Sequence, residues 1–205
     1  MLLRSFVTFI IVFFISSFIY SQENYQRPIV GIYTSKGDFF LELYYDIYPK
    51  TVSNFLQYVE DGFYDNTLIH RVLSKFIVQG GGFSVDYTYK PTRQSLWTES
   101  SKKVRNIRGT IAMAKTIHDH SAKSQFFLNV VDNPEFDYQS RNKRGYAVFG
   151  HVIQGIEILD KISTVKTHSY THIISPEDSI DFDHLPKKPI VVYKVVLQQD
   201  GFYAQ

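Results

Sequence analysis

Residues 69–83 combine β-forming apolar residues with side chains that can do chemistry, in the run IHRVLSKFIVQGGGF. Strands buried on both faces read as continuous Val, Ile and Leu, and strands with one solvated face alternate strictly, whereas this run does neither. It carries an imidazole at His70, a guanidinium at Arg71 and an amide at Gln79, all of which form hydrogen bonds. Taken alone, the pattern favours a simple interpretation, in which His70 and Arg71 lie on a solvated face and the glycines at 80–82 form a bend or a bulge.

Other candidate chemistries have weaker support. Histidine and aspartate are common metal ligands, and two regions contain them: His118, Asp119, His120, His168, His172 and His184. No HExxH or CxxC spacing accompanies them, so we expect solvated loop residues and no metal site. The three glycines lack the GxxxxGK[ST] pattern of a phosphate-binding loop, and no GxSxG sequence marks a nucleophilic serine. The sequence therefore favours neither a phosphate site nor a hydrolase.

Composition excludes further classes. The 205-residue chain has a formal net charge of +2 and no cysteine. A local basic cluster at Lys102, Lys103, Arg105 and Arg108 is typical of a solvated loop, and without a long basic stripe we do not expect a nucleic-acid partner. The absence of cysteine excludes disulfides and a lipid-modified N-terminal cysteine, so packing must provide the stability.

Residues 1–21 are typical of a secretory signal peptide. Arg4 precedes an apolar run at 6–20, and polar or small residues follow near a cleavage point at about Ser21. The run is slightly shorter than the roughly 20 apolar residues of a membrane span, and an uncleaved membrane anchor is the alternative. We therefore expect export, a short flexible lead at 22–28, one domain at 29–205 and no stable membrane insertion after cleavage.

The elements that must position these residues are short strands and two helices. Between residues 29 and 45, two β-rich runs flank a turn at Gly37, and β-like runs recur at 67–73, 76–81, 110–115, 124–131, 145–153 and 189–197. Apolar spacing predicts a helix that starts near Pro49, with Thr51 as N-cap and Gly62 as stop, and a second helix at 155–163.

Many strands with only two helices favour a closed barrel over an α/β fold, in which the two element types alternate. We expect a mainly β protein, a barrel capped by the two helices. Two long stretches, 84–108 and 164–188, read as irregular, and loops of that length are usually functional or flexible.

Four blocks in this order resemble the successive signatures of the cyclophilin family of peptidyl-prolyl cis/trans isomerases: NFLQYVEDGFYDNTLIHRVLSKFIVQGGGF, RNIRGTIAMAKT, KSQFFLNV and GYAVFGHVIQG. The likeness extends from about Ile29 to Leu197, and four ordered blocks are more specific than any one motif. The signal-like N-terminus and the residues of the second and fourth blocks are most similar to the exported bacterial branch of the family. The resemblance implies an eight-stranded closed antiparallel β-barrel with two α-helices, located in a bacterial periplasm.

The resemblance also implies a groove for a proline-containing peptide on the outside of the barrel, with catalytic positions at Arg71, Phe76 and Gln79. The same blocks imply further substrate-binding positions: His70, Ile77, Met113, Ala114, Gln125, Phe127, Phe136 and Tyr146. The chain departs from the family after the SQFF block, where members place an aromatic residue followed by Leu-Asp. Counting without gaps puts Glu135 at the aromatic position, unless Phe136 fills it through a shift of one residue.

Isomerisation of an X-Pro bond is rotation against a barrier of about 18–20 kcal/mol, with no bond to break. A guanidinium that donates a hydrogen bond to the prolyl nitrogen of the twisted amide would lower this barrier, and Arg71 fits that role. Phe76 and Phe127 would hold the prolyl ring, and no cofactor is required. We expect a monomeric isomerase of proline-containing peptides and unfolded protein chains; the alternative is a non-catalytic proline-peptide-binding chaperone module on the same fold.

Overall fold

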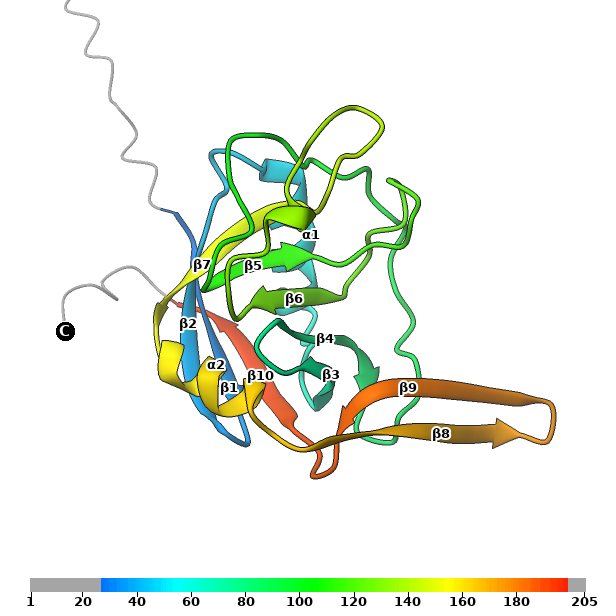
Figure 1. Cartoon of the computed structure of the whole chain (residues 1–205). Helices are drawn as coiled ribbons and strands as arrows, with labels where there is room; N and C mark the ends of the chain where they lie inside the picture. Colours follow the sequence, from blue (N-terminus) through cyan, green and yellow to red (C-terminus); the bar gives the residue numbers. More distant parts are fainter. Residues whose placement is uncertain (1–26, 199–205) are drawn as a thin grey trace, which may run out of the picture.

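The computed structural model describes residues 27–198, which form a closed β-barrel with one separate hairpin (Figure 1). Eight antiparallel strands close in the order β1-β10-β3-β4-β6-β5-β7-β2. Their bounds are β1 Ile29–Thr34, β2 Gly37–Leu43, β3 Thr67–Leu73, β4 Ile77–Ser84, β5 Thr110–Met113, β6 Phe126–Asn129, β7 Val148–Gln154 and β10 Val191–Leu197. The remaining elements are α1 Pro49–Glu60, the short 3-10 helix η1 Pro134–Phe136, α2 Ile156–Ser163, β8 Thr167–Ser175 and β9 Asp178–Pro186. The predicted eight-stranded barrel with two helices is confirmed.

Period-two alternation fills the barrel interior. In β2, Phe39, Leu41 and Leu43 are buried, while the residues between them are less buried or exposed. Both helices add apolar side chains to the same core, and Phe55 of α1 contacts the rings of Tyr64, Phe126 and Phe149. The inward residues are therefore committed to packing, and the outward residues of the same strands are available for a binding surface.

The start of α1 differs from the prediction. The helix begins at Pro49, whose ring fixes a helical φ at the first position, and Thr51 is not its N-cap. Instead, the Glu99 carboxylate accepts hydrogen bonds from the backbone N and the Oγ1 of Thr51, at 2.6 and 2.7 Å. The predicted stop is confirmed, because α1 ends at Glu60 and Gly62 follows with a left-handed φ of 62°.

The stretch 164–188 is not irregular, which corrects the prediction. Most of it forms the β8–β9 hairpin, whose strands pair only with each other and which extends away from the barrel in Figure 1. Nearly all of β8 is exposed, so it carries no alternating apolar pattern that would have marked it as a strand. The other long stretch, 84–108, contains no helix or strand after the end of β4.

The predicted signal peptide at 1–21 lies outside the described residues, as do 22–26 of the predicted lead and 199–205 at the other end. The last two residues of the lead are held against the barrel. Arg27 contacts Glu42 and Asp46 at 3.1 and 2.9 Å, and the Pro28 carbonyl accepts a hydrogen bond from Leu43 N. Neither helix within 27–198 has the length and apolar character needed to cross a bilayer.

Candidate active site

The predicted catalytic residues meet at one cavity on the outside of the barrel. The cavity has a volume of about 340 Å³, and we call it the aromatic cavity. Its lining residues are Arg71, Leu73, Phe76, Ile77, Gln79, Ala114, Lys115, Phe127, Phe136 and Tyr146. Leu73 and Lys115 are additions to the predicted set. Leu73 lies two residues after Arg71 on β3, so strand periodicity was a signal that could have found it.

Strand pairing places the outward side chains in one row. Arg71 of β3 lies opposite Gln79 of β4, and Gln79 lies opposite Phe127 of β6. Phe127 in turn lies opposite Ala112 of β5. Adjacent strands are about 4.8 Å apart, so this row brings the cation and the amide of one hairpin together with the apolar surface of Phe127, which lies much later in the sequence.

Aromatic rings form the apolar wall of the cavity. The Phe136 ring lies 5.2 Å from Phe76, 5.5 Å from Phe127 and 4.9 Å from Tyr146, and the Phe127 and Tyr146 rings are 5.1 Å apart. Phe136 is at the end of η1, whereas its neighbour Glu135 is exposed. Phe136, and not Glu135, therefore occupies the aromatic position that the sequence left open.

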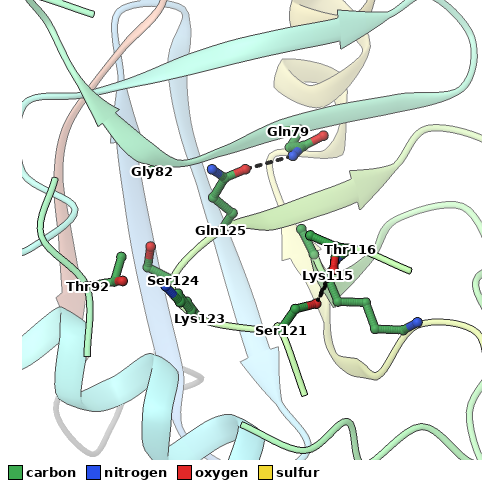
Figure 2. A pocket seen from close by; sticks show the side chains of 10 residues that line it. Gln79, Gly82, Thr92, Lys115, Thr116, Ser121, Lys123, Ser124 and Gln125 are labelled. Atoms are coloured by element: carbon green, nitrogen blue, oxygen red, sulfur yellow. Dashed lines mark hydrogen bonds between the residues drawn. The ribbon is translucent and has the colours of Figure 1, made fainter. Parts of the chain in front are cut away.

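A chain of hydrogen bonds forms the polar side, and we call it the glutamine relay. Arg71 Nη1 donates a long hydrogen bond of 3.4 Å to Gln79 Oε1. Gln79 Nε2 donates to Gln125 Oε1 at 2.9 Å, the bond drawn between these two side chains in Figure 2. Within residues 27–198, Arg71 has no carboxylate partner. Its other N–H groups are therefore available to a ligand in the cavity.

Two predicted substrate-binding residues lie elsewhere. Met113 is 2% exposed and packs in the barrel interior, because it follows the outward-facing Ala112 on β5. His70 is 6% exposed, and its ring packs edge-on against Phe83 at 4.6 Å. The pairing of β3 with β4 shifts register between Ile69 and Arg71, so regular alternation does not hold at His70. The His70 side chain lines neither cavity. Burial lowers the pKa of His70 from 6.5 to about 4 and keeps the imidazole neutral.

A second cavity of about 260 Å³ adjoins the first (Figure 2). It shares Gln79, Ala114 and Lys115 with the aromatic cavity, and Gln125 lines it. Loop residues complete it, including Thr92 and Ser121. Their position was not predictable from local patterns, since two distant loops meet here. No group of three or more His, Cys, Asp or Glu side chains within the described part of the chain is placed to hold a metal ion.

Comparison with known proteins identifies the family. The family model "Cyclophilin type peptidyl-prolyl cis-trans isomerase/CLD" matches residues 29–195. The chain belongs to the cyclophilin family. This cyclophilin is 45% identical over 159 residues to peptidyl-prolyl cis-trans isomerase A of Dickeya dadantii, covering 78% of each chain. It is 41% identical over 155 residues to peptidyl-prolyl cis-trans isomerase B of Escherichia coli, covering 74% of this chain and 94% of the relative. The predicted family and enzyme class, peptidyl-prolyl cis-trans isomerase, are thereby confirmed.

Solved structures give the same result for the fold. The crystal structure of a Cryptosporidium parvum cyclophilin type peptidyl-prolyl cis-trans isomerase is 25% identical in sequence, with a TM-score of 0.66 over 85% of this chain and 99% of that one. A second structure of that protein, in the presence of the dipeptide Ala-Pro, has a TM-score of 0.65 over 84% of this chain. The cyclophilin barrel is therefore shared over nearly all the described residues.

Proposed function

We propose that this cyclophilin accelerates rotation about X-Pro bonds by holding the prolyl ring in the aromatic cavity while Arg71 donates a hydrogen bond to the prolyl nitrogen. One observation carries the proposal. A guanidinium without a carboxylate partner lines the same cavity of about 340 Å³ as Phe76, Phe127 and Phe136. In proline the amide nitrogen is part of an otherwise apolar ring. A site for the twisted amide therefore needs an apolar wall beside a hydrogen-bond donor.

The energetics favour Arg71 as the donor. In the planar amide, resonance engages the nitrogen lone pair, and only in the twisted amide does the nitrogen accept a hydrogen bond. An interaction present only in the transition state raises the rate without strengthening ground-state binding. Each tenfold acceleration requires about 1.4 kcal/mol, so a charged hydrogen bond together with positioning supplies several decades.

Gln79 prepares the guanidinium for this task. Its carbonyl accepts one Arg71 N–H, and its own amide is held by Gln125, so the planar fork of donors keeps one orientation. Phe127 is 2% exposed, and its ring packs against those of Phe136 and Tyr146. It gives the prolyl ring a wall that stays in place while the preceding residue rotates. Each interaction in this scheme is made by a side chain of the protein.

We propose proline-containing peptides and unfolded protein chains as substrates. The related Cryptosporidium parvum protein was crystallised in the presence of the dipeptide Ala-Pro, which supports a short X-Pro unit as the recognised element. A side chain that matters only for binding would affect affinity and rate together. The alternative, a binding module without turnover, is therefore separable from the isomerase by the behaviour of Arg71.

A coupled isomerisation assay on short X-Pro peptides tests the catalytic role. Arg71→Ala should lower kcat/KM by on the order of a hundredfold with little change in ground-state peptide affinity, and Arg71→Lys should recover only part of the loss. Arg141→Ala is the matched control, because Arg141 is exposed and lines neither cavity. A chelator should leave the rate unchanged. Near-full turnover of folded Arg71→Ala would refute the assignment.

We also propose that the protein is exported, to a bacterial periplasm, and acts there as a monomer on exported chains. The support is the sequence pattern at 1–21, in which Arg4 precedes an apolar run and a polar segment follows. Mass spectrometry of the exported protein should find an N-terminus near Gln22, and size-exclusion chromatography should find a monomer. An intact Met1 in the membrane fraction would contradict the cleavage.

A further inference from the structure

The β8–β9 hairpin is fixed to the barrel by a small apolar cluster. Its members from β9 are Ile180, Phe182 and Leu185, and the buried barrel residue in the cluster is Phe83, near the end of β4. The hairpin strands pair only with each other, and the barrel closes without them (Figure 1). The hairpin therefore contributes no strand to the barrel, although it is packed against a strand that carries part of the active site.

Ring contacts lead from the hairpin to the residue beside Arg71. The Phe182 and Phe83 ring centroids are 4.7 Å apart, and the Phe83 and His70 centroids are 4.6 Å apart. All three side chains are buried, with exposed fractions of 4%, 4% and 6%. His70 directly precedes Arg71, so a displacement of the His70 ring acts on the backbone that carries the guanidinium.

The same segment of β4 holds Gln125. Gly82, which precedes Phe83, lies directly against the Gln125 side chain, because a Cβ built at Gly82 would be 2.5 Å from Gln125 Nε2. Gln125 also acts on His70, since its hydrogen bonding favours the protonated imidazole and offsets a small part of the burial effect on the His70 pKa. Gln125 thus lies between the Phe83 segment and the rest of the glutamine relay.

We propose that the β8–β9 hairpin is a positioning element for catalysis, in which Phe182 acts through Phe83 and His70 to hold Gln125, and with it the glutamine relay, in register with Arg71. This inference rests on the proposed catalytic role of Arg71. A Gln side chain has rotatable bonds and loses its orientation when its neighbours give way, whereas catalysis needs the donor within fractions of an ångström. Packing of the hairpin against Phe83 restricts the Gln125 side chain from outside the barrel.

The first test substitutes the contact residue. Phe182→Ala should lower kcat roughly two- to tenfold with little change in KM, since the relay acts on the transition state. Phe182→Leu should restore most of the rate. Ile173→Ala is the matched control on the same hairpin, because Ile173 is 72% exposed. In NMR spectra, the Gln79 and Gln125 side-chain amide signals should shift in Phe182→Ala and stay in place in Ile173→Ala.

A hairpin-shortened variant keeps the inference testable if Phe182→Ala fails to fold. Thr167 and Pro186 are Cα partners, so an Asn-Gly turn can replace residues 168–185 between them. The barrel should still melt cooperatively, and kcat should fall by about the same factor as in Phe182→Ala. Wild-type kcat in a folded, shortened variant would overturn the proposal.

A double-mutant cycle separates positioning from a general loss of folded protein. In the Arg71→Ala background, Phe182→Ala should cause no further loss, because the group that it positions is gone. An equal loss in both backgrounds would overturn the inference and show that the hairpin only stabilises the fold. The two proposals fail differently: full activity of Arg71→Ala refutes the catalytic assignment, whereas an inactive Arg71→Ala beside a fully active Phe182→Ala refutes only the hairpin's role.

Discussion

Replacing Gly82 by alanine should lower isomerase activity while the barrel stays folded. Gly82 has no left-handed φ, so alanine causes no backbone strain there. The added carbon would lie 2.5, 2.6 and 2.8 Å from the Nε2, Cγ and Cδ atoms of Gln125, closer than any real van der Waals contact. These are the three nearest atoms, and all belong to one flexible side chain. The substitution therefore displaces Gln125 and little else.

The size of the effect follows from the bond that is lost. Displacing Gln125 breaks the 2.9 Å hydrogen bond from Gln79 Nε2, which leaves the Gln79 amide free to rotate away from Arg71. A neutral intramolecular hydrogen bond contributes about 0.5–1.5 kcal/mol. If this energy is lost from the transition state, kcat/KM falls roughly two- to tenfold.

The assay is coupled isomerisation of a short X-Pro peptide, with a thermal melt of each variant. Gln125→Ala provides the matched background, because it removes the side chain that the new methyl group would meet. There, Gly82→Ala should have no further effect on kcat/KM. Full activity of Gly82→Ala, or the same loss in both backgrounds, would refute the role given to the glutamine relay.

Two further predictions concern burial and the aromatic wall. The folded pKa of His70, about 4, lies below the 6.5 of an unperturbed imidazole, so between these pH values the unfolded chain binds a proton that the folded protein does not. The contribution of the neutral His70 to the free energy of unfolding is therefore complete above about pH 6.5. It is lost as the pH falls toward 4, and the loss is up to about 3 kcal/mol. Urea titrations should show this loss in the wild type and a flatter profile in His70→Gln; parallel profiles would contradict it. Phe136→Ala should weaken binding of X-Pro peptides in titrations, and Glu135→Ala should not; equal affinities of the two variants would place the aromatic wall elsewhere.

The sequence alone determined the barrel and the centre of the site, because both depend on local patterns. Alternation in runs such as β2 reports which residues point inward, and it does so without knowledge of strand partners. Arg71, Phe76 and Gln79 lie within one short block, and the resemblance of that block to a cyclophilin signature assigned them to one groove.

The same alternation could have corrected the assignment of Met113, but not that of His70. Met113 is adjacent to Ala114, so in a regular strand only one of the two faces the groove. At His70, the pairing of β3 with β4 shifts register between Ile69 and Arg71, so alternation does not predict the direction of that side chain. Met113 packs in the barrel interior and His70 packs against Phe83. For Met113 the information was present in the sequence, since period two is a local property.

Tertiary structure alone decided features that depend on contacts between distant segments. The cap of α1 comes from Glu99, 48 residues after Thr51, and no local signal links the two. Phe136 and Glu135 are neighbours, and the fold of η1 against the barrel determines which of them lines the cavity. The buried apolar residues of the β8–β9 hairpin lie on β9, and the packing of Phe182 on Phe83 holds this strand on the barrel. The exposed strand β8 forms beside it because it pairs with β9. A strand that is stabilised mainly by pairing with its neighbour shows no alternation of apolar and polar residues in its own sequence, because its side chains face solvent.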